Sequence, residues 1–80
     1  MARTFRSALR ASILSLPIGG ERRLSSPVRV PNNSMMGYGN ICGVYRHGKN
    51  GAARCFDEFN NCYSLSELSE AECQAILAAL

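Results

Sequence analysis

Apolar and polar positions follow a helical spacing in the first part of the chain. On an α-helix the apolar residues share one side and the arginines gather on the other: Phe5, Leu9, Ile13 and Leu16 against Arg3, Arg6 and Arg10. Pro17, Gly19 and Gly20 follow and end this pattern. The spacing therefore predicts an N-terminal amphipathic helix with a basic face.

A second helical pattern occupies the C-terminal end. Ser64-Leu-Ser-Glu67 and Ser69-Glu-Ala-Glu72 both match the capping box, in which a serine and a glutamate satisfy the backbone at a helix start. The apolar residues of this region fall on one side of a helix: Leu65, Leu68, Ala75, Ile76, Ala79 and Leu80. We expect one helix over about residues 65–80.

The segment 41–56 has the pattern of a β-hairpin. A run rich in Ile, Val and Tyr leads into His47-Gly-Lys-Asn-Gly51, and a second short run ends at Phe56. Asn-Gly is a strong signal for a two-residue turn, because both turn positions need positive φ. This turn would place Tyr45 opposite Phe56 as a stabilising aromatic pair. The patterns together predict a small, cysteine-rich α+β fold.

Charge divides the chain into a basic first part and a near-neutral remainder. Residues 1–24 carry five arginines and one glutamate, whereas residues 25–80 carry four basic and five acidic residues. A basic amphipathic helix is typical of an organelle transit peptide, and Arg23-Leu24-Ser25 resembles a mitochondrial processing site, which predicts cleavage near Leu24 to Ser26. We expect a leader at 1–24, an extended linker at 25–36 and a cysteine-stapled module at 37–80. A chloroplast transit peptide, a secretory signal and a cytosolic basic tail are the alternatives.

Four cysteines lie in the second half of the chain: Cys42, Cys55, Cys62 and Cys73. Disulfides would compensate for the small core of so short a chain. Four cysteines allow three connectivities, of which Cys55–Cys62 with Cys42–Cys73 is the one we favour. A zinc site in which His47 replaces one cysteine is a second reading, although the usual close cysteine pairs are absent. Reduced cysteines packed as small apolar residues are the third.

No catalytic arrangement is visible in the spacing of cysteine, histidine and acidic residues. His47 stands in a predicted turn, where a histidine is usually solvated. The sequence His47-Gly-Lys-Asn-Gly51 lacks the Gly-x4-Gly-Lys-Ser/Thr pattern of a phosphate loop. We therefore expect no enzyme activity, no cofactor, no metal and no small-molecule substrate.

Two short motifs resemble Kazal-type protease inhibitors. Tyr38-Gly-Asn-Ile-Cys42-Gly resembles the Tyr-x-Pro-Val-Cys-Gly sequence of that family, and Asn60-Asn-Cys62 resembles the start of its central helix. The resemblance implies a hairpin, a helix and disulfides in a secreted binding module. The family has six cysteines and this chain has four, so no inhibitory site is carried over.

These patterns combine into one expected function. The chain would be a non-catalytic accessory subunit of a larger mitochondrial assembly, in the intermembrane space or a membrane-associated complex. It would dock through the apolar face of the C-terminal helix and through an apolar arm with Val28, Val30, Met35 and Met36. We expect protein partners, no nucleic acid because the basic residues outside the leader are not clustered, and no transmembrane span because no apolar run reaches ~20 residues. The alternative is a secreted, disulfide-stapled binding module of the Kazal kind.

Overall fold

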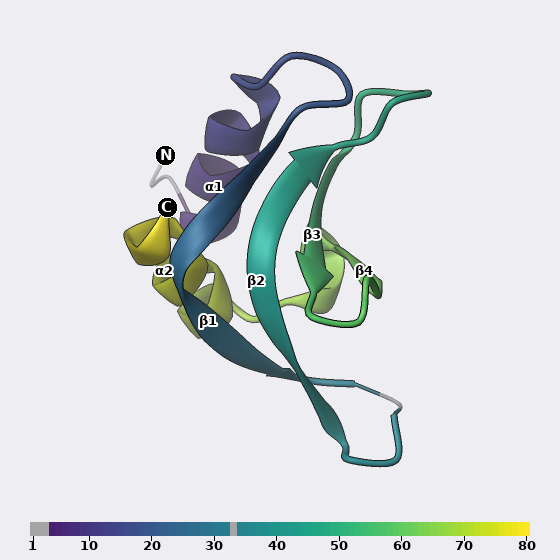
Figure 1. Cartoon of the computed structure of the whole chain (residues 1–80). Coiled ribbons are helices and arrows are strands. Elements are labelled where there is room, and N and C mark those ends of the chain that lie inside the picture. Colours follow the sequence, from purple (N-terminus) through teal and green to yellow (C-terminus); the bar gives the residue numbers. More distant parts are fainter. Residues whose placement is uncertain (1–3, 33) are drawn as a thin grey trace.

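The computed structural model describes residues 4–32 and 34–80, which form a small α+β fold (Figure 1). In chain order the elements are α1 (Phe5–Leu14), β1 (Glu21–Pro31), β2 (Tyr38–Arg46), β3 (Ala53–Asp57), β4 (Cys62–Ser64), the short 3-10 helix η1 (Leu65–Glu67) and α2 (Glu70–Ala79). The strands form an antiparallel sheet in the order β1-β2-β3-β4, and the two helices pack side by side against it. The predicted α+β class is thus confirmed. Within the described residues, neither helix has the length and apolar character needed to cross a membrane.

The predicted hairpin is formed by β2 and β3, but its predicted register is wrong. Tyr45 pairs with Arg54 instead of Phe56, a shift of two residues. A shift of two keeps each side chain on its own face of the sheet. Tyr45 and Phe56 therefore still meet as diagonal neighbours, with ring centroids 6.1 Å apart.

The register differs because the turn is longer than two residues. The His47 N–H donates to the Ala52 carbonyl at 2.9 Å, and the Gly51 N–H donates to the His47 carbonyl at 2.9 Å. Gly51 has the positive φ that the Asn-Gly signal requires, at 69°. The glycine is thus placed as predicted, but it ends a wider loop rather than closing a two-residue turn.

β1 is an edge strand, and it spans the boundary between the leader and the linker that were expected from the sequence. It pairs with β2 through residues 21–23 and 28–31, and the ladder is interrupted between Arg23 and Val28. Pro27 and Pro31 fit this position, because an edge strand uses the hydrogen-bonding groups of one side only. Residues 25–31 of the expected linker belong to the sheet, and residues 34–36 form a bend and a turn. Asn33 of that linker lies outside the described residues.

The single helix expected over 65–80 is two elements, η1 and α2. The first capping box closes on η1, where the Glu67 carboxylate accepts the Ser64 N–H at 2.8 Å. In the second box the Glu72 carboxylate accepts the Ser69 N–H at 2.8 Å, and the Ser69 hydroxyl accepts the Glu72 N–H at 3.2 Å. The prediction of one continuous helix was wrong, because each capping box starts a separate element.

The hydrophobic core lies between the helices and the face of the sheet that they cover, called the covered face below. Every element contributes to it: Leu9, Ile13, Val30, Ile41, Val44, Cys55, Tyr63, Leu65, Leu68, Cys73 and Ile76. Leu9 and Ile13 of α1 are 0% exposed. The predicted amphipathic helix is thus present, and its apolar side is part of the core. Arg3 of its predicted basic face lies outside the described residues.

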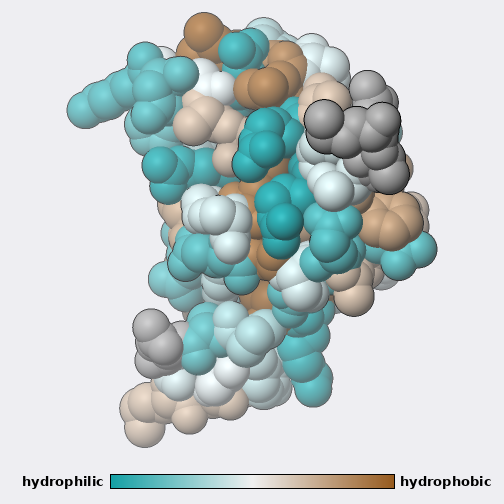
Figure 2. All heavy atoms as spheres, turned by 180° about the vertical axis from the view of Figure 1, so that it is seen from behind, coloured by the Kyte–Doolittle hydropathy of each residue, from teal (hydrophilic) through white to brown (hydrophobic). Residues whose placement is uncertain are grey.

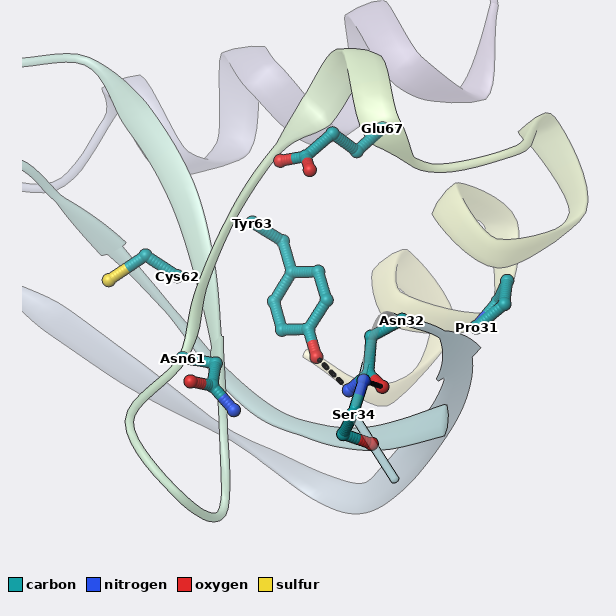
Figure 3. Close-up of a pocket in the computed structure, with 7 residues that line it drawn as sticks. All are labelled: Pro31, Asn32, Ser34, Asn61, Cys62, Tyr63 and Glu67. Atoms are coloured by element: carbon teal, nitrogen blue, oxygen red, sulfur yellow. Dashed lines mark hydrogen bonds between the residues drawn. The ribbon is translucent and has the colours of Figure 1, made fainter. Parts of the chain in front are cut away.

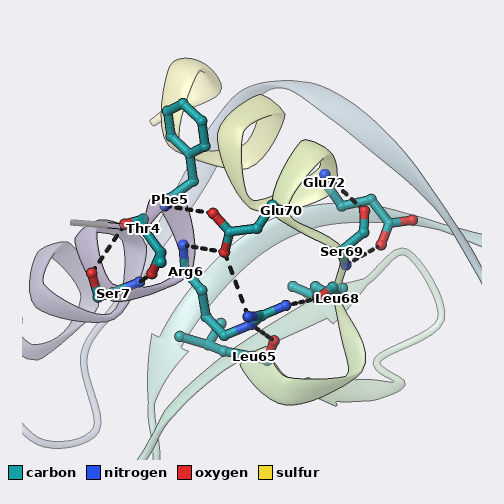
Figure 4. Close-up of polar contacts among 9 residues, drawn as sticks. All are labelled: Thr4, Phe5, Arg6, Ser7, Leu65, Leu68, Ser69, Glu70 and Glu72. Atoms are coloured by element: carbon teal, nitrogen blue, oxygen red, sulfur yellow. Dashed lines mark hydrogen bonds and ion pairs between the residues drawn. The ribbon is translucent and has the colours of Figure 1, made fainter. Parts of the chain in front are cut away.

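The N-terminal end of α1 is held by groups from η1 and α2 (Figure 4). The Glu70 carboxylate accepts the backbone N–H groups of Phe5 at 2.8 Å and Arg6 at 3.1 Å, where a helix terminus favours negative charge. The Arg6 guanidinium donates to the carbonyl oxygens of Leu65 and Leu68 and lies 3.5 Å from the Glu70 carboxylate. These contacts join the two ends of the chain.

Candidate functional site

A buried carboxylate organises the turn between β3 and β4. Asp57 is 1% exposed, and its Oδ1 accepts the N–H groups of Phe59 at 2.9 Å and Asn61 at 2.8 Å. Its Oδ2 accepts the Asn61 side-chain amide at 3.1 Å and the Tyr63 hydroxyl at 2.8 Å. The Tyr63 oxygen in turn accepts a hydrogen bond from Asn32 Nδ2 at 2.9 Å (Figure 3). This network joins the segment after β1 to β3 and β4.

The network holds Asp57 in its ionised form. Burial by itself raises the pKa of this carboxyl, but the hydrogen bonds from Tyr63, Asn61 and Phe59 outweigh burial and lower the pKa below its usual value. Both oxygens are already occupied by donors of the protein. Asp57 is therefore suited to anchoring the turn and not to proton transfer at neutral pH.

A cleft of about 520 Å³ opens beside this network (Figure 3). Its lining comes from the end of β1, the β1–β2 loop, the β3–β4 turn, β4 and η1: Pro31, Asn32, Ser34, Asn61, Cys62, Tyr63 and Glu67. The polar groups of Asn32 and Tyr63 bond to each other, and the Glu67 carboxylate is engaged in its capping box. Because these groups already have partners, the cleft gives little support to a ligand site.

The loop between β1 and β2 presents two apolar side chains to solvent. Met35 is fully exposed and Met36 is 62% exposed, and Figure 2 shows hydrophobic atoms on this loop, which projects at the lower left. The Asn32 N–H donates to the Gly37 carbonyl at 3.1 Å, and the Gly37 N–H donates to the Ser34 carbonyl at 3.0 Å. Gly37 has a φ of 80°, which favours glycine. Two flexible thioethers on a closed loop are typical of an adaptable protein contact.

The face of the sheet opposite the helices, called the open face below, carries arginines and aromatic rings. Paired residues share a face, and two rows lie here: Arg23, Gly43, Phe56 and Cys62, and beside them Glu21, Tyr45, Arg54 and Ser64. The Phe56 ring lies over Gly43, where an added Cβ would be 2.2 Å from the ring. The Arg23 guanidinium lies 5.6 Å from the Phe56 centroid, and the Arg29 guanidinium lies 4.2 Å from the Tyr38 centroid.

A shallow groove of about 480 Å³ crosses this face. Its lining residues are Gly19, Glu21, Arg23, Tyr45, His47, Gly48, Phe56, Asn60 and Cys62. Burial, with Cys62 as the next cause, raises the pKa of Tyr45 to about 12. The Tyr45 phenol therefore stays neutral at physiological pH and lies beside the Cys62 thiol.

The four cysteines are free thiols in the structure, and the expected pairs are not brought together. Cys55 is in the core, whereas Cys62 on the next strand is exposed on the open face. Cys42 is half-buried in β2, whereas Cys73 is buried on α2. The two buried thiols share the core, and burial, with Cys73 as the second cause, raises the pKa of Cys55 to about 12. For Cys55 and Cys73 the arrangement therefore favours the interpretation of reduced cysteines packed as small apolar residues.

His47 lies at the start of the β2–β3 loop, as expected. Its Nδ1 accepts the Lys49 N–H at 3.2 Å, and its ring centroid is 6.5 Å from that of Tyr45. Across residues 4–32 and 34–80, no three His, Cys, Asp or Glu side chains converge where a metal ion could bind. His47 therefore has a local role in the turn.

Sequence reasoning missed the role of Asp57, which it placed in a polar bend. A local signal existed, because an aspartate side chain often binds the backbone N–H two residues ahead. Asn60 in the same turn has a φ of 64°, a conformation that asparagine tolerates. The contact of Tyr63 with Asn32 spans 31 positions and had no local signal.

Comparison of the chain with known protein families, curated proteins and solved structures found no match. The geometry of the chain itself is therefore the basis for inferring its function. Two surfaces stand out in that geometry: the Met35–Met36 loop and the open face of the sheet.

Proposed function

We propose that the chain is a non-catalytic accessory subunit of a larger mitochondrial assembly, and that it docks on a protein partner through the Met35–Met36 loop. The observation that carries this proposal is the exposure of both methionines on a loop whose base is closed by hydrogen bonds. Fully burying a methionine side chain contributes about 1.5–3 kcal/mol. A partner pocket that accepts both side chains would therefore anchor the subunit.

The proposed docking surface is narrower than the one expected from the sequence. Val30 of the predicted arm and Cys73 and Ile76 of α2 are buried in the chain's own core. The helix face is thus occupied inside the fold. The methionine pair is the part of the arm that stays exposed and can meet a partner.

Delivery to the mitochondrion would depend on the amphipathic sequence of α1. Because Leu9 and Ile13 are buried in the folded chain, an import receptor would have to bind this helix before the chain folds. The expected processing site falls where β1 is not paired with β2, and Ser25 and Ser26 are exposed there. Cleavage at this point would remove α1 from the core, and the host assembly would then cover the surface that α1 covers.

Native electrophoresis of mitochondrial extracts tests the docking surface. We expect the tagged chain to migrate with a large complex, and the double variant Met35→Ser, Met36→Ser to migrate as a free subunit. Phe59→Ser is the matched control, because Phe59 is 70% exposed on a different loop, and it should stay in the complex. A wild-type chain that migrates alone, or a methionine variant that stays bound, would contradict the proposal. Appearance of the chain in culture medium would instead favour the secreted alternative.

A further inference from the structure

Strand pairing places Arg54 on the same open face of the sheet as Arg23 and Arg29, from which it is distant in sequence. Arg23 and Arg29 come from β1, and Arg54 comes from β3. Among the described residues, the ion pair found joins Arg6 and Glu70 at the end of α1, so none of these three arginines is in an ion pair within residues 4–32 and 34–80. The Nε of Arg54 is enclosed and has no acceptor within the described part of the chain. Positive charge on this face is therefore available to an anionic ligand.

Aromatic rings lie next to these arginines. The Arg23 guanidinium stands over Phe56 and the Arg29 guanidinium over Tyr38, while Tyr45 contacts Phe56 with centroids 6.1 Å apart. Nucleobases stack on aromatic rings and on flat guanidinium groups. An acidic protein segment would use the charge of this face but not its rings. Rings and cations side by side therefore match a ligand that alternates bases with phosphates.

From this arrangement we propose that the open face binds single-stranded nucleic acid, with the arginines contacting phosphates and the half-buried rings of Tyr38 and Tyr45 contacting bases. Phe56 is only 9% exposed and supports Arg23 and Tyr45 by packing against them. This goes beyond the accessory role, because the Met35–Met36 loop would hold the subunit in its assembly and leave the open face to the nucleic acid. All three arginines belong to the uncleaved chain; cleavage near Leu24 to Ser26 would remove Arg23 and leave Arg29 and Arg54 on this face. The sequence predicted no such partner because the arginines are not clustered along the chain. The pairing of β1 with β2 and β3 supplies the cluster.

Two carboxylates on the same face limit the strength of this binding. Glu21 lies in the row of Tyr45, and Glu58 accepts a hydrogen bond from Asn40 at 3.1 Å. Lys49 in the neighbouring loop adds a positive charge beside the three arginines. The surplus of positive charge is small, so binding should be weak, independent of sequence and sensitive to salt.

Fluorescence anisotropy with a labelled single-stranded oligonucleotide of mixed sequence tests the proposal on the purified full chain. Three phosphate contacts predict that raising salt from ~50 to ~200 mM weakens binding by about 20-fold. Absence of binding at low salt, or binding that salt does not weaken, would overturn the proposal. The oligonucleotide assay contains no protein partner, so its outcome is independent of the docking test above.

Two charge-matched variants locate the site. Arg29→Gln on the open face should weaken binding several-fold. It should also reduce the slope of log affinity against log salt concentration by the contribution of about one phosphate contact. Arg10→Gln removes the same charge from the exposed side of α1 and should leave binding almost unchanged. Equal effects of the two variants would show that net charge alone attracts the oligonucleotide, which would overturn the assignment to the open face.

A third variant tests stacking. Tyr45→Leu keeps an apolar side chain but removes the ring, and loss of one stacked base should weaken binding by about 5-fold or more. A thermal unfolding curve confirms that the variant is folded, and Tyr38→Leu provides a second ring variant if it is not. Polyglutamate should compete poorly with the oligonucleotide. Effective competition by polyglutamate, together with ring variants that bind normally, would mark a general anion surface and contradict the proposal.

Discussion

The two faces of the sheet differ in almost every respect, although the same strands form both. On the covered face, Ile41 and Val44 of β2 are almost completely buried against the helices. On the open face, Tyr45 of the same strand stands beside Arg54. Successive residues of a strand point to opposite faces, so one short sequence can serve both. The covered face provides stability, and the open face and its adjoining loop are free for binding.

The comparison also shows where the fold is vulnerable. A domain of this size holds only about 3–5 kcal/mol without disulfides or a partner, and the thiols are free in the structure. Loss of one core side chain should therefore lower the stability more than a substitution on the open face does. Three substitutions test this ordering.

Removing a core contact of α1 should have the largest effect. Leu9 is 0% exposed, and truncating a buried leucine costs about 2–5 kcal/mol, which is most of the stability available. Urea unfolding followed by circular dichroism would show Leu9→Ala largely unfolded at low urea. Leu14→Ala is the control on the same helix, because Leu14 is 42% exposed. Equal, small losses in the two variants would contradict the assignment of α1 to the core.

Replacing the buried carboxylate should have an intermediate, pH-dependent effect. Asp57→Asn loses the charged hydrogen bonds of the turn, at a cost of about 1.5–3 kcal/mol at neutral pH. The folded chain has the lower pKa for Asp57, so this contribution is present above the ordinary carboxyl pKa and is lost as the pH falls through the folded value. Unfolding curves should show that the wild type has a larger free energy of unfolding than Asp57→Asn at neutral pH, and that this difference is absent at strongly acidic pH. The same advantage at both pH values would count against the ionised network.

A change on the open face should have the smallest effect on stability. The Cβ of Gly43→Ala would lie 2.2 Å from the Phe56 ring, so the ring must move, at a cost of about 1–3 kcal/mol. Gly48→Ala is the matched control because an added Cβ there meets no atom within 4 Å. Thermal unfolding should separate the two variants, and a Gly43 variant as stable as the control would show that the ring does not pack on the strand.

Local signals predicted much of the fold, and they did so where the controlling contacts are short in sequence. Both capping boxes formed, since each depends on residues three positions apart. The helical spacing of Leu9 and Ile13 was enough to predict α1 and its apolar side. The hairpin was predicted from its turn residues, but its register depended on the exact length of the loop.

The elements that were missed depend on distant partners. β1 contains two prolines and an interrupted ladder, so its alternation is weak, and it is ordered by pairing with β2. β4 has three residues, too few for a pattern. The same reason hid the open-face site, because Arg23 and Arg54 come onto one face only after the sheet has formed. Met35 and Met36 were predicted as contacts because they are neighbours in the sequence.

Hydrogen exchange of the full-length chain, followed by mass spectrometry of peptides, is the most direct test of a covered face that includes α1. The backbone amides around Leu9 and Ile13 should exchange as slowly as those of β2 and α2, because all three elements would open together when the core unfolds. Rapid exchange throughout α1, with β2 and α2 still protected, would show that the first helix is detached and would contradict the account.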